Sequence, residues 1–156
     1  MTSDPACRPA READAAVLTA LAIRSKANWG YSAAFMEACR GELTCTPEDI
    51  ADANMTYLVA ESAGRVAGYA ALARQADGIA EIDAMFVEPA LIGSGIGKLL
   101  MTEIVAQARD MGMTRIMIQA DPHAAAFYAG IGATPCGERE SDSIPGRMLP
   151  LYRIDV

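Results

Sequence analysis

The first third of the chain places apolar residues at helical intervals. Between residues 12 and 27 they recur every three or four positions, as one face of a helix requires. Ser32 is suited to cap a second helix that Gly41 would end, and "TPED" at 46–49 has the capping threonine and first-turn proline of a third. Residues 7–10 fit a short strand. The pattern therefore predicts one strand followed by three helices.

The middle of the chain changes to the patterning of strands. Residues 55–62, 65–75 and 79–89 are compatible with β-structure, and short turns that contain glycine separate them. Three consecutive strands joined in this way predict an antiparallel meander. Between residues 95 and 111 the apolar positions return to one broad helix face, which Gly112 is placed to terminate.

The nearly all-apolar residues 115–120 fit a strand that is buried on both faces. Together with strand 79–87 and helix 95–111, this strand predicts a βαβ unit. The remaining segments are expected as one helix and two strands, at 122–131, 134–140 and 149–155. The predicted fold class is α+β, with a mixed, mostly antiparallel central sheet flanked by helices, in one domain over residues 1–156.

Composition limits the partners. The chain is 52% apolar and 21% charged, and no run approaches the ~18 uninterrupted apolar residues of a membrane span. Its 13 basic residues are scattered and its formal net charge is −7, which argues against nucleic acid and is compatible with a cationic small substrate. We therefore expect neither a membrane nor a nucleic-acid partner.

Cysteine and histidine usage bears on location and on metals. Four cysteines lie far apart without a CxxC pair, and His123 is the single histidine, so we expect no structural metal. The first twelve residues, "MTSDPACRPARE", contain no apolar segment of a signal peptide. These features favour a protein of the reducing cytoplasm.

The stretch "EPALIGSGIGKLL" at 88–100 sets three glycines between a predicted strand and a predicted helix. Gly93, Gly95 and Gly97 allow backbone N–H groups to close around an anion, and the positive end of the helix dipole favours a phosphate there. Neither the dinucleotide fingerprint nor the P-loop matches the spacing of these glycines. A tight turn without a ligand is the alternative.

This loop resembles the pyrophosphate loop of the GNAT (GCN5-related N-acetyltransferase) superfamily, whose pattern Gln/Arg-x-x-Gly-x-Gly/Ala becomes Ile92-x-x-Gly95-x-Gly97 here. The segment "EIDAMFVEP" before it is similar to the fourth strand of the family. Downstream, "DPHAAAFYAGIGA" at 121–133 resembles its second cofactor motif. The predicted order of elements also agrees over nearly the whole chain.

The resemblance implies the GNAT acyl-CoA fold, in which the fourth and fifth strands splay apart and acetyl-CoA lies between them. The backbone of Met85, Phe86 and Val87 would then pair with the pantetheine amides. Backbone N–H groups of the glycine loop would hold the pyrophosphate, namely those of Gly93, Ser94, Gly95, Ile96, Gly97 and Lys98.

For catalysis the resemblance implies direct attack of an amine on the thioester, so the protein must supply an acid and a base. Tyr128 stands where the family places the tyrosine that protonates the CoA thiolate. Glu81 is the first candidate for the base, and Asp83 shares its strand face if no bulge intervenes. The plainer alternatives are a packed aromatic for Tyr128 and a solvated charged face for the two acids.

Two residues depart from the family pattern. Ile92 replaces the usual Gln or Arg, so we expect weaker pyrophosphate binding. Asp121 replaces the usual Asn beside the cofactor, and we expect it to cap the helix that starts at Pro122.

The GNAT acceptor pocket generally lies between the first two helices and the last hairpin. Trp29 and Tyr31 fall in the first of these regions, where they would either wall an apolar or amine-bearing substrate or pack on the core. Arg147 follows a predicted type II turn at 145–146 and would either clamp a substrate carboxylate or join a dimer contact.

The sequence thus predicts an acetyl-CoA-dependent N-acetyltransferase acting on the primary amine of a small molecule. A peptide or protein N-terminus is an alternative acceptor. A non-catalytic acyl-CoA sensor or interaction module of the same fold is the alternative from another class, and a plain nucleotide-binding domain is the third. The terminal strand is free to pair, which is compatible with a homodimer.

Overall fold

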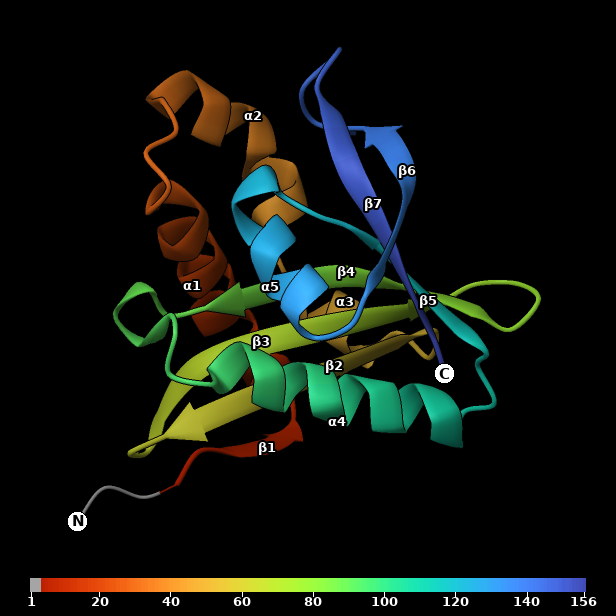
Figure 1. Cartoon of the computed structure of the whole chain (residues 1–156). Coiled ribbons are helices and arrows are strands. Elements are labelled where there is room, and N and C mark those ends of the chain that lie inside the picture. Colours follow the sequence, from red (N-terminus) through yellow and green to blue (C-terminus); the bar gives the residue numbers. More distant parts are fainter. Residues whose placement is uncertain (1–3) are drawn as a thin grey trace.

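Seven strands form one twisted sheet with helices on both faces (Figure 1). The computed structural model describes residues 4–156, so the expectation about a signal peptide rests partly on residues outside the described range. Across the sheet the strand order is β1-β2-β3-β4-β5-β7-β6. The strands are β1 (Ala6–Pro9), β2 (Met55–Ser62), β3 (Arg65–Arg74), β4 (Ile79–Val87), β5 (Arg115–Gln119), β6 (Thr134–Glu140) and β7 (Met148–Asp155).

Five α-helices connect the strands within residues 4–156. They are α1 (Ala15–Ala27), α2 (Ala33–Leu43), α3 (Pro47–Ala51), α4 (Ile96–Asp110) and α5 (Ala125–Gly130). Single 3₁₀ turns at 12–14, 89–91 and 122–124 precede α1, α4 and α5. None of these helices has the length and apolar composition needed to cross a membrane.

The predicted elements are all present, and the α+β fold class is confirmed. One expected boundary is wrong, because Gly41 does not end the second helix, which continues to Leu43. Gly41 keeps an ordinary negative φ, whereas the glycine that ends a helix usually adopts a left-handed backbone. The capping residues Ser32 and Thr46 are confirmed, since each side chain accepts a backbone N–H from the first turn of its helix.

The strand pairing confirms the expected meander and the βαβ unit. Strands β1 to β4 are antiparallel neighbours. Strands β4 and β5 pair in parallel, and α4 connects them. Strand β7 then returns antiparallel between β5 and β6. The sheet is therefore mixed and mostly antiparallel.

Alternation along the strands supplies one hydrophobic core on each face of the sheet. In β2, Leu58 and Ala60 pack in the cluster that α4 covers, while Tyr57 and Val59 pack in the cluster that α1 and α2 cover. The largest fully buried side chains belong to these two layers, namely Leu18, Leu21, Leu72, Leu100, Ile104, Ile116, Ile118 and Val59. Each buried aliphatic side chain contributes about 1.5–3 kcal/mol relative to its exposed state.

Strands β4 and β5 part soon after they begin to pair. The parallel ladder joins Ile79–Glu81 to Arg115–Met117 only, although β4 continues to Val87. A β-bulge interrupts β4, because Ile82 and Ala84 lie opposite consecutive residues of β3 and Asp83 between them has no partner there. A bulge bends the strand that carries it. Beyond Glu81, the edge of β4 that faces β5 is therefore open.

We predict that Gly68→Ala in β3 destabilises the fold by about 1–3 kcal/mol, the usual cost of overpacking a core. A Cβ at this position would lie 2.8 Å from the Phe86 carbonyl oxygen and 3.0 Å from Cγ2 of Ile96. Urea denaturation measures the loss. Gly41→Ala is the matched control, since nothing lies within 4 Å there, and it should stabilise α2 by about 0.5–1 kcal/mol. An unchanged midpoint for Gly68→Ala would contradict this packing of α4 on the sheet.

Candidate functional site

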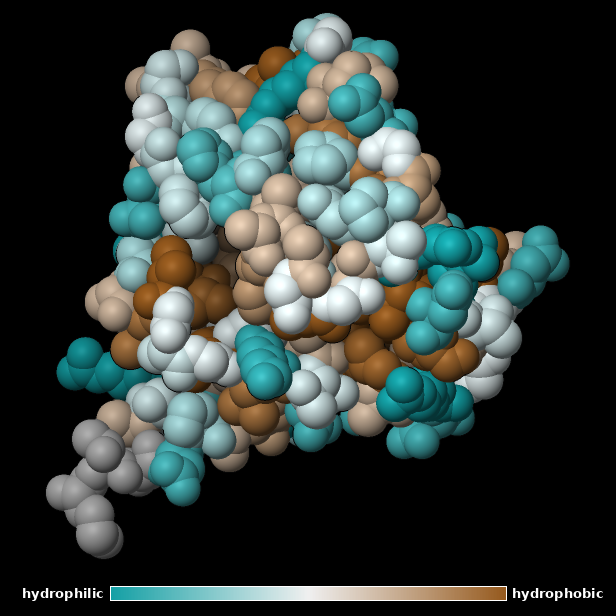
Figure 2. Space-filling view, in the orientation of Figure 1, coloured by the Kyte–Doolittle hydropathy of each residue, from teal (hydrophilic) through white to brown (hydrophobic). Residues whose placement is uncertain are grey.

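Two cavities lie at the parting of β4 and β5 and share one wall. The first, about 470 Å³, lies between α1, the end of β4, the loop before α4, and α5. Figure 2 shows apolar surface around a hollow in this region. The second, about 380 Å³, lies between β4, the end of α2 and the β6–β7 hairpin. The residues common to both are Lys26, Met85, Phe86, Asp121, Ala124 and Tyr128.

The glycine loop borders the first cavity, and its three glycines are required for two different reasons. Gly93 and Gly95 have φ values of +86° and +96°, which side-chain-bearing residues rarely adopt. Gly97 has an ordinary helical backbone, but a Cβ there would lie 2.8 Å from the ring of Phe127. The loop therefore cannot be replaced by an ordinary turn sequence without strain.

Most backbone N–H groups of this loop have no acceptor within residues 4–156. The available groups are those of Gly93, Gly95, Ile96, Gly97 and Lys98. Ser94 differs from the prediction, because its N–H donates to the Leu91 carbonyl at 3.1 Å and its hydroxyl donates to the same oxygen. Five donors at the start of α4, together with the helix dipole, make a site that fits a pyrophosphate.

The open edge of β4 forms another wall of the first cavity. Met85, Phe86 and Val87 line it, and their backbones pair with β3 on the opposite edge, at Gly68, Tyr69 and Ala70. An extended ligand with amide groups could add to such an edge as another strand. The cavity therefore suits a long molecule with amides along its chain and phosphates at one end.

Comparison with known proteins agrees with this geometry. The family model described as acetyltransferase (GNAT) family matches residues 21–133. The chain belongs to the GNAT family. An uncharacterized N-acetyltransferase of Mycobacterium bovis is 33% identical over 95 residues, which cover 59% of this chain and 61% of that protein. The chain thus aligns with about three fifths of the length of this curated relative.

Solved structures share the GNAT fold over the whole length. A GCN5-related N-acetyltransferase from Rhodopseudomonas palustris superimposes with a TM-score of 0.80 at 24% identity, covering 100% of this chain and 98% of the other. The PaiA N-acetyltransferase from Thermoplasma acidophilum, solved in complex with coenzyme A, gives a TM-score of 0.80 at 17% identity and covers 99% and 100%. At such identities the likeness establishes the fold.

Tyr128, which the GNAT resemblance singles out as the acid, lies where the two cavities meet. It projects from α5, is 5% exposed and has its ring 6.2 Å from that of Tyr152. Burial raises the pKa of its phenol above the ordinary range. The hydroxyl meets no hydrogen-bond partner within residues 4–156, so it is available to a ligand in either cavity.

The two candidate bases both line the second cavity despite the bulge between them. Glu81 is already engaged, because Arg139 forms an ion pair with one carboxylate oxygen and Gln75 donates to the other at 3.0 Å. Asp83 has no such partner in the described part of the chain. Burial raises the pKa of Asp83, and the charges of nearby carboxylates, Asp49, Glu81 and Glu42, raise it further. Asp83 reaches solvent at the cavity wall and is therefore better poised than Glu81 to accept a proton.

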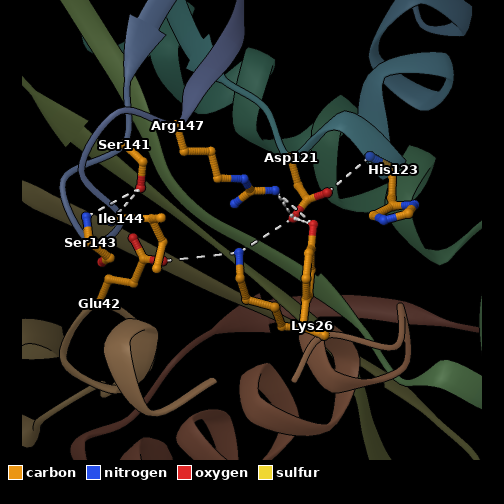
Figure 3. A network of polar contacts seen from close by, with 9 residues as sticks. Lys26, Glu42, Asp121, His123, Ser141, Ser143, Ile144 and Arg147 are labelled. Atoms are coloured by element: carbon orange, nitrogen blue, oxygen red, sulfur yellow. Dashed lines mark hydrogen bonds and ion pairs between the residues drawn. The ribbon is translucent and has the colours of Figure 1, made fainter. Parts of the chain in front are cut away.

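Asp121 lines both cavities and is the centre of a polar network. Figure 3 shows this network. Its Oδ1 accepts the backbone N–H of His123 at 2.9 Å, which confirms the expected cap. Its Oδ2 accepts the hydroxyl of Tyr31 at 2.8 Å and lies 3.4 Å from Lys26 Nζ and 3.6 Å from Arg147 Nη2. Two cations therefore offset this one carboxylate.

The network changes the acidity of its members. Burial alone would raise the pKa of Asp121, but hydrogen bonds from His123 and Tyr31 and the charges of Lys26 and Arg147 outweigh it, so its pKa is lowered. The pKa of Tyr31 is raised to about 12, chiefly by burial and next by its hydrogen bond to Asp121. At neutral pH the network therefore contains an ionised Asp121 and a neutral Tyr31.

The three residues expected at the acceptor pocket do not all line the same cavity. Arg147 lines the second cavity and donates to the Tyr31 hydroxyl at 2.7 Å. Tyr31 lies behind it, with its ring 4.0 Å from that of Phe35. Trp29 lines the first cavity, where it stacks on His123 at 4.8 Å. Of the three expected residues, Arg147 alone borders the second cavity.

Sequence analysis missed two cations of the site, Lys26 and Arg139. Lys26 follows a helical apolar stripe in α1, and Arg139 lies in a charged edge strand. Lysines and arginines at an ordinary protein surface also occur after helical apolar stripes and in charged edge strands, so neither position indicates a functional site. Their roles depend on contacts with Asp121 and Glu81, 95 and 58 positions away in the chain, and no local pattern indicates such contacts.

We predict that Asp121→Asn lowers the stability at neutral pH by about 1.5–3 kcal/mol, as expected for loss of hydrogen bonds to a charged group. Because the folded-state pKa of Asp121 is lowered, this contribution is present above its ordinary pKa of about 4 and is lost as pH falls through the lowered value. Urea titrations of both proteins at neutral and acidic pH test this. Asp110→Asn at the exposed end of α4 is the control. A difference that persists unchanged in strong acid would contradict the assignment.

Proposed function

We propose that this chain is an acetyl-CoA-dependent N-acetyltransferase that acts on a primary amine of a small molecule. The observation that carries the proposal is the meeting of the two cavities at Tyr128, one bordered by backbone N–H groups without an acceptor in residues 4–156 and the other by carboxylates. Membership of the GNAT family and the coenzyme A complex of the Thermoplasma acidophilum protein support it.

The first cavity would hold acetyl-CoA. The available N–H groups at the start of α4 would bind its pyrophosphate, and Lys98 beside them would add a positive charge. The open edge of β4 at Met85 to Val87 would pair with the pantetheine amides. Ile92, 45% exposed on the cavity wall, contributes no charge to the site, and weaker phosphate binding is expected from it.

The second cavity would hold the acceptor. Its volume is that of a small-molecule site, and five carboxylates against three cations in its lining favour a positively charged amine. The acceptor would attack as the neutral amine, after its ammonium form has lost a proton to water. Asp83 would take the proton that the nitrogen loses as the amide forms, and Tyr128 would donate toward the sulfur of the leaving group. A peptide terminus remains an alternative acceptor. The four unpaired cysteines agree with a cytoplasmic location.

A non-catalytic acyl-CoA sensor of the same fold is the competing proposal, because Ile92 replaces the usual phosphate-binding side chain. It predicts saturable binding of acetyl-CoA without release of CoA in the presence of any amine. An enzyme releases CoA with at least one amine of a broad panel.

We predict that acetyl-CoA raises the thermal midpoint, whereas ATP and NAD do not. At a hundred times its dissociation constant the ligand adds about 2.7 kcal/mol of stability. Trp29 is the one tryptophan of the chain and lines the first cavity, so its fluorescence gives an independent measure of binding. If neither the midpoint nor the Trp29 emission responds to acetyl-CoA, the proposal fails.

We predict that Asp83→Asn lowers kcat/KM by about 10²–10⁴, the usual contribution of a general base. In the wild type, kcat/KM should rise with pH through the raised pKa of Asp83, because the base must be ionised. Glu81→Gln is the matched variant. It should keep activity and shift the rising limb to lower pH, since it removes a negative charge that raises the pKa of Asp83. Loss of activity in Glu81→Gln but not in Asp83→Asn would make Glu81 the base.

A further inference from the structure

Lys26 stands apart from the other cations of the site. Within residues 4–156 it alone among the lysines and arginines lines both cavities. We propose that Lys26 is a further catalytic residue, whose ammonium group balances the negative charge on the CoA sulfur as the carbon–sulfur bond breaks. This inference rests on the proposed acetyl transfer and assigns to that reaction a residue in α1.

Two carboxylates hold the ammonium group of Lys26 at the junction of the cavities without using all of its N–H donors. The side chain is 11% exposed, and Nζ lies 3.4 Å from Asp121 Oδ2 and 4.0 Å from Glu42 Oε1. Figure 3 shows it between these two carboxylates. Neither separation is as short as the 2.7–2.9 Å, roughly, of a charge-assisted hydrogen bond. An ammonium has three N–H groups, and with Asp121 accepting one of them and Glu42 facing a second, a third is available to a further anion.

The chemistry of Tyr128 explains why a cation is needed beside the sulfur. The CoA thiolate would form at the junction of the two cavities, beside a phenol that is itself buried. Burial raises the pKa of Tyr128, so its phenol favours the neutral form, which is a hydrogen-bond donor. Tyr128 can donate a hydrogen bond to the sulfur but cannot remove its charge. An anion formed where water is largely excluded needs a cation nearby.

The other cations are less suited to this role. Arg147 lines the second cavity, where its guanidinium lies over the ring of Phe35 at 4.8 Å and donates to Tyr31. Arg139 is paired with Glu81. Lys98 lies at the start of α4, among the N–H groups suited to phosphate. Lys26 is the cation that borders both reactants.

The resulting step balances atoms and charge. The amine nitrogen bonds to the carbonyl carbon, and the carbon–sulfur bond breaks with its electron pair on sulfur. The acceptor loses two protons from its ammonium form: the first goes to water before attack and leaves a lone pair on the nitrogen, and the second goes from the nitrogen to Asp83 as the amide forms. The sulfur leaves as a thiolate beside Lys26, with a hydrogen bond from Tyr128, and takes a proton from water after release. Lys26 keeps its proton throughout.

The test measures the thiol of bound CoA directly, by the ultraviolet absorbance of its thiolate as a function of pH. CoA bound to the wild type should ionise at lower pH than free CoA. Lys26→Met should raise the pKa of the bound thiol by about one unit or more, the usual effect of losing an opposite charge within ~4–6 Å. Its kcat/KM with an accepted amine should fall about tenfold, as one pKa unit implies. Binding of desulfo-CoA, which lacks the thiol, measures separately any loss of affinity that comes from removing a positive charge from the first cavity.

Two further variants separate charge from structure. Lys26→Arg keeps the charge and should retain most of the lowered thiol pKa. Arg40→Met removes a positive charge from an exposed position of α2, 68% accessible, and should leave the thiol pKa as in the wild type. If Lys26 merely holds Asp121, Lys26→Met will lower the melting temperature and the affinity for desulfo-CoA without moving the thiol pKa.

An unmoved thiol pKa in Lys26→Met therefore overturns the inference, even if activity falls. Failure of the proposed function would give a different experimental result. In that case the wild type binds no CoA, or binds it and releases none from acetyl-CoA with any amine, and both proposals are overturned. Binding and turnover by the wild type together with an unmoved thiol pKa in Lys26→Met reject the role of Lys26 alone.

Discussion

The early parting of β4 from β5 is the constraint on which the rest of the site depends. Three residue pairs join the two strands, and beyond them β4 presents unpaired backbone groups to a cavity. Backbone polar groups at such an edge need partners. The bulge at Asp83 bends β4 in the same region, and both Glu81 and Asp83 still border the second cavity. One irregular strand thus provides both the binding edge and the acidic groups.

Asp121 joins parts of the chain that the sheet does not hold together. Its contacts reach α1 through Lys26, the loop between α1 and α2 through Tyr31, and the β6–β7 hairpin through Arg147. Each separate ion pair near the surface would contribute little. Their convergence on one mostly buried carboxylate, which also caps the turn before α5, gives the junction of the cavities a defined shape.

The sequence predicted the fold more completely than it predicted the site. Periodicity and caps located the elements to within about two residues, because burial on one face repeats regularly along the chain. The glycine loop was predictable because its requirement is local. The ion pair of Glu81 was not predictable, since Arg139 reaches it from another strand. Lys26 was missed for the same reason, because its neighbours come from distant segments.

The distribution of charge shows how an acidic chain could bind a polyanion. The formal net charge is −7, yet Lys26 and Lys98 outnumber the single carboxylate, Asp121, in the lining of the first cavity. The other acids of the site gather in the second cavity, where a cationic acceptor would be favoured. An aspartate in place of asparagine at position 121 is tolerable under these conditions, because Lys26 and Arg147 compensate its charge. Within the site, the excess of negative charge therefore lies in the cavity proposed for the acceptor.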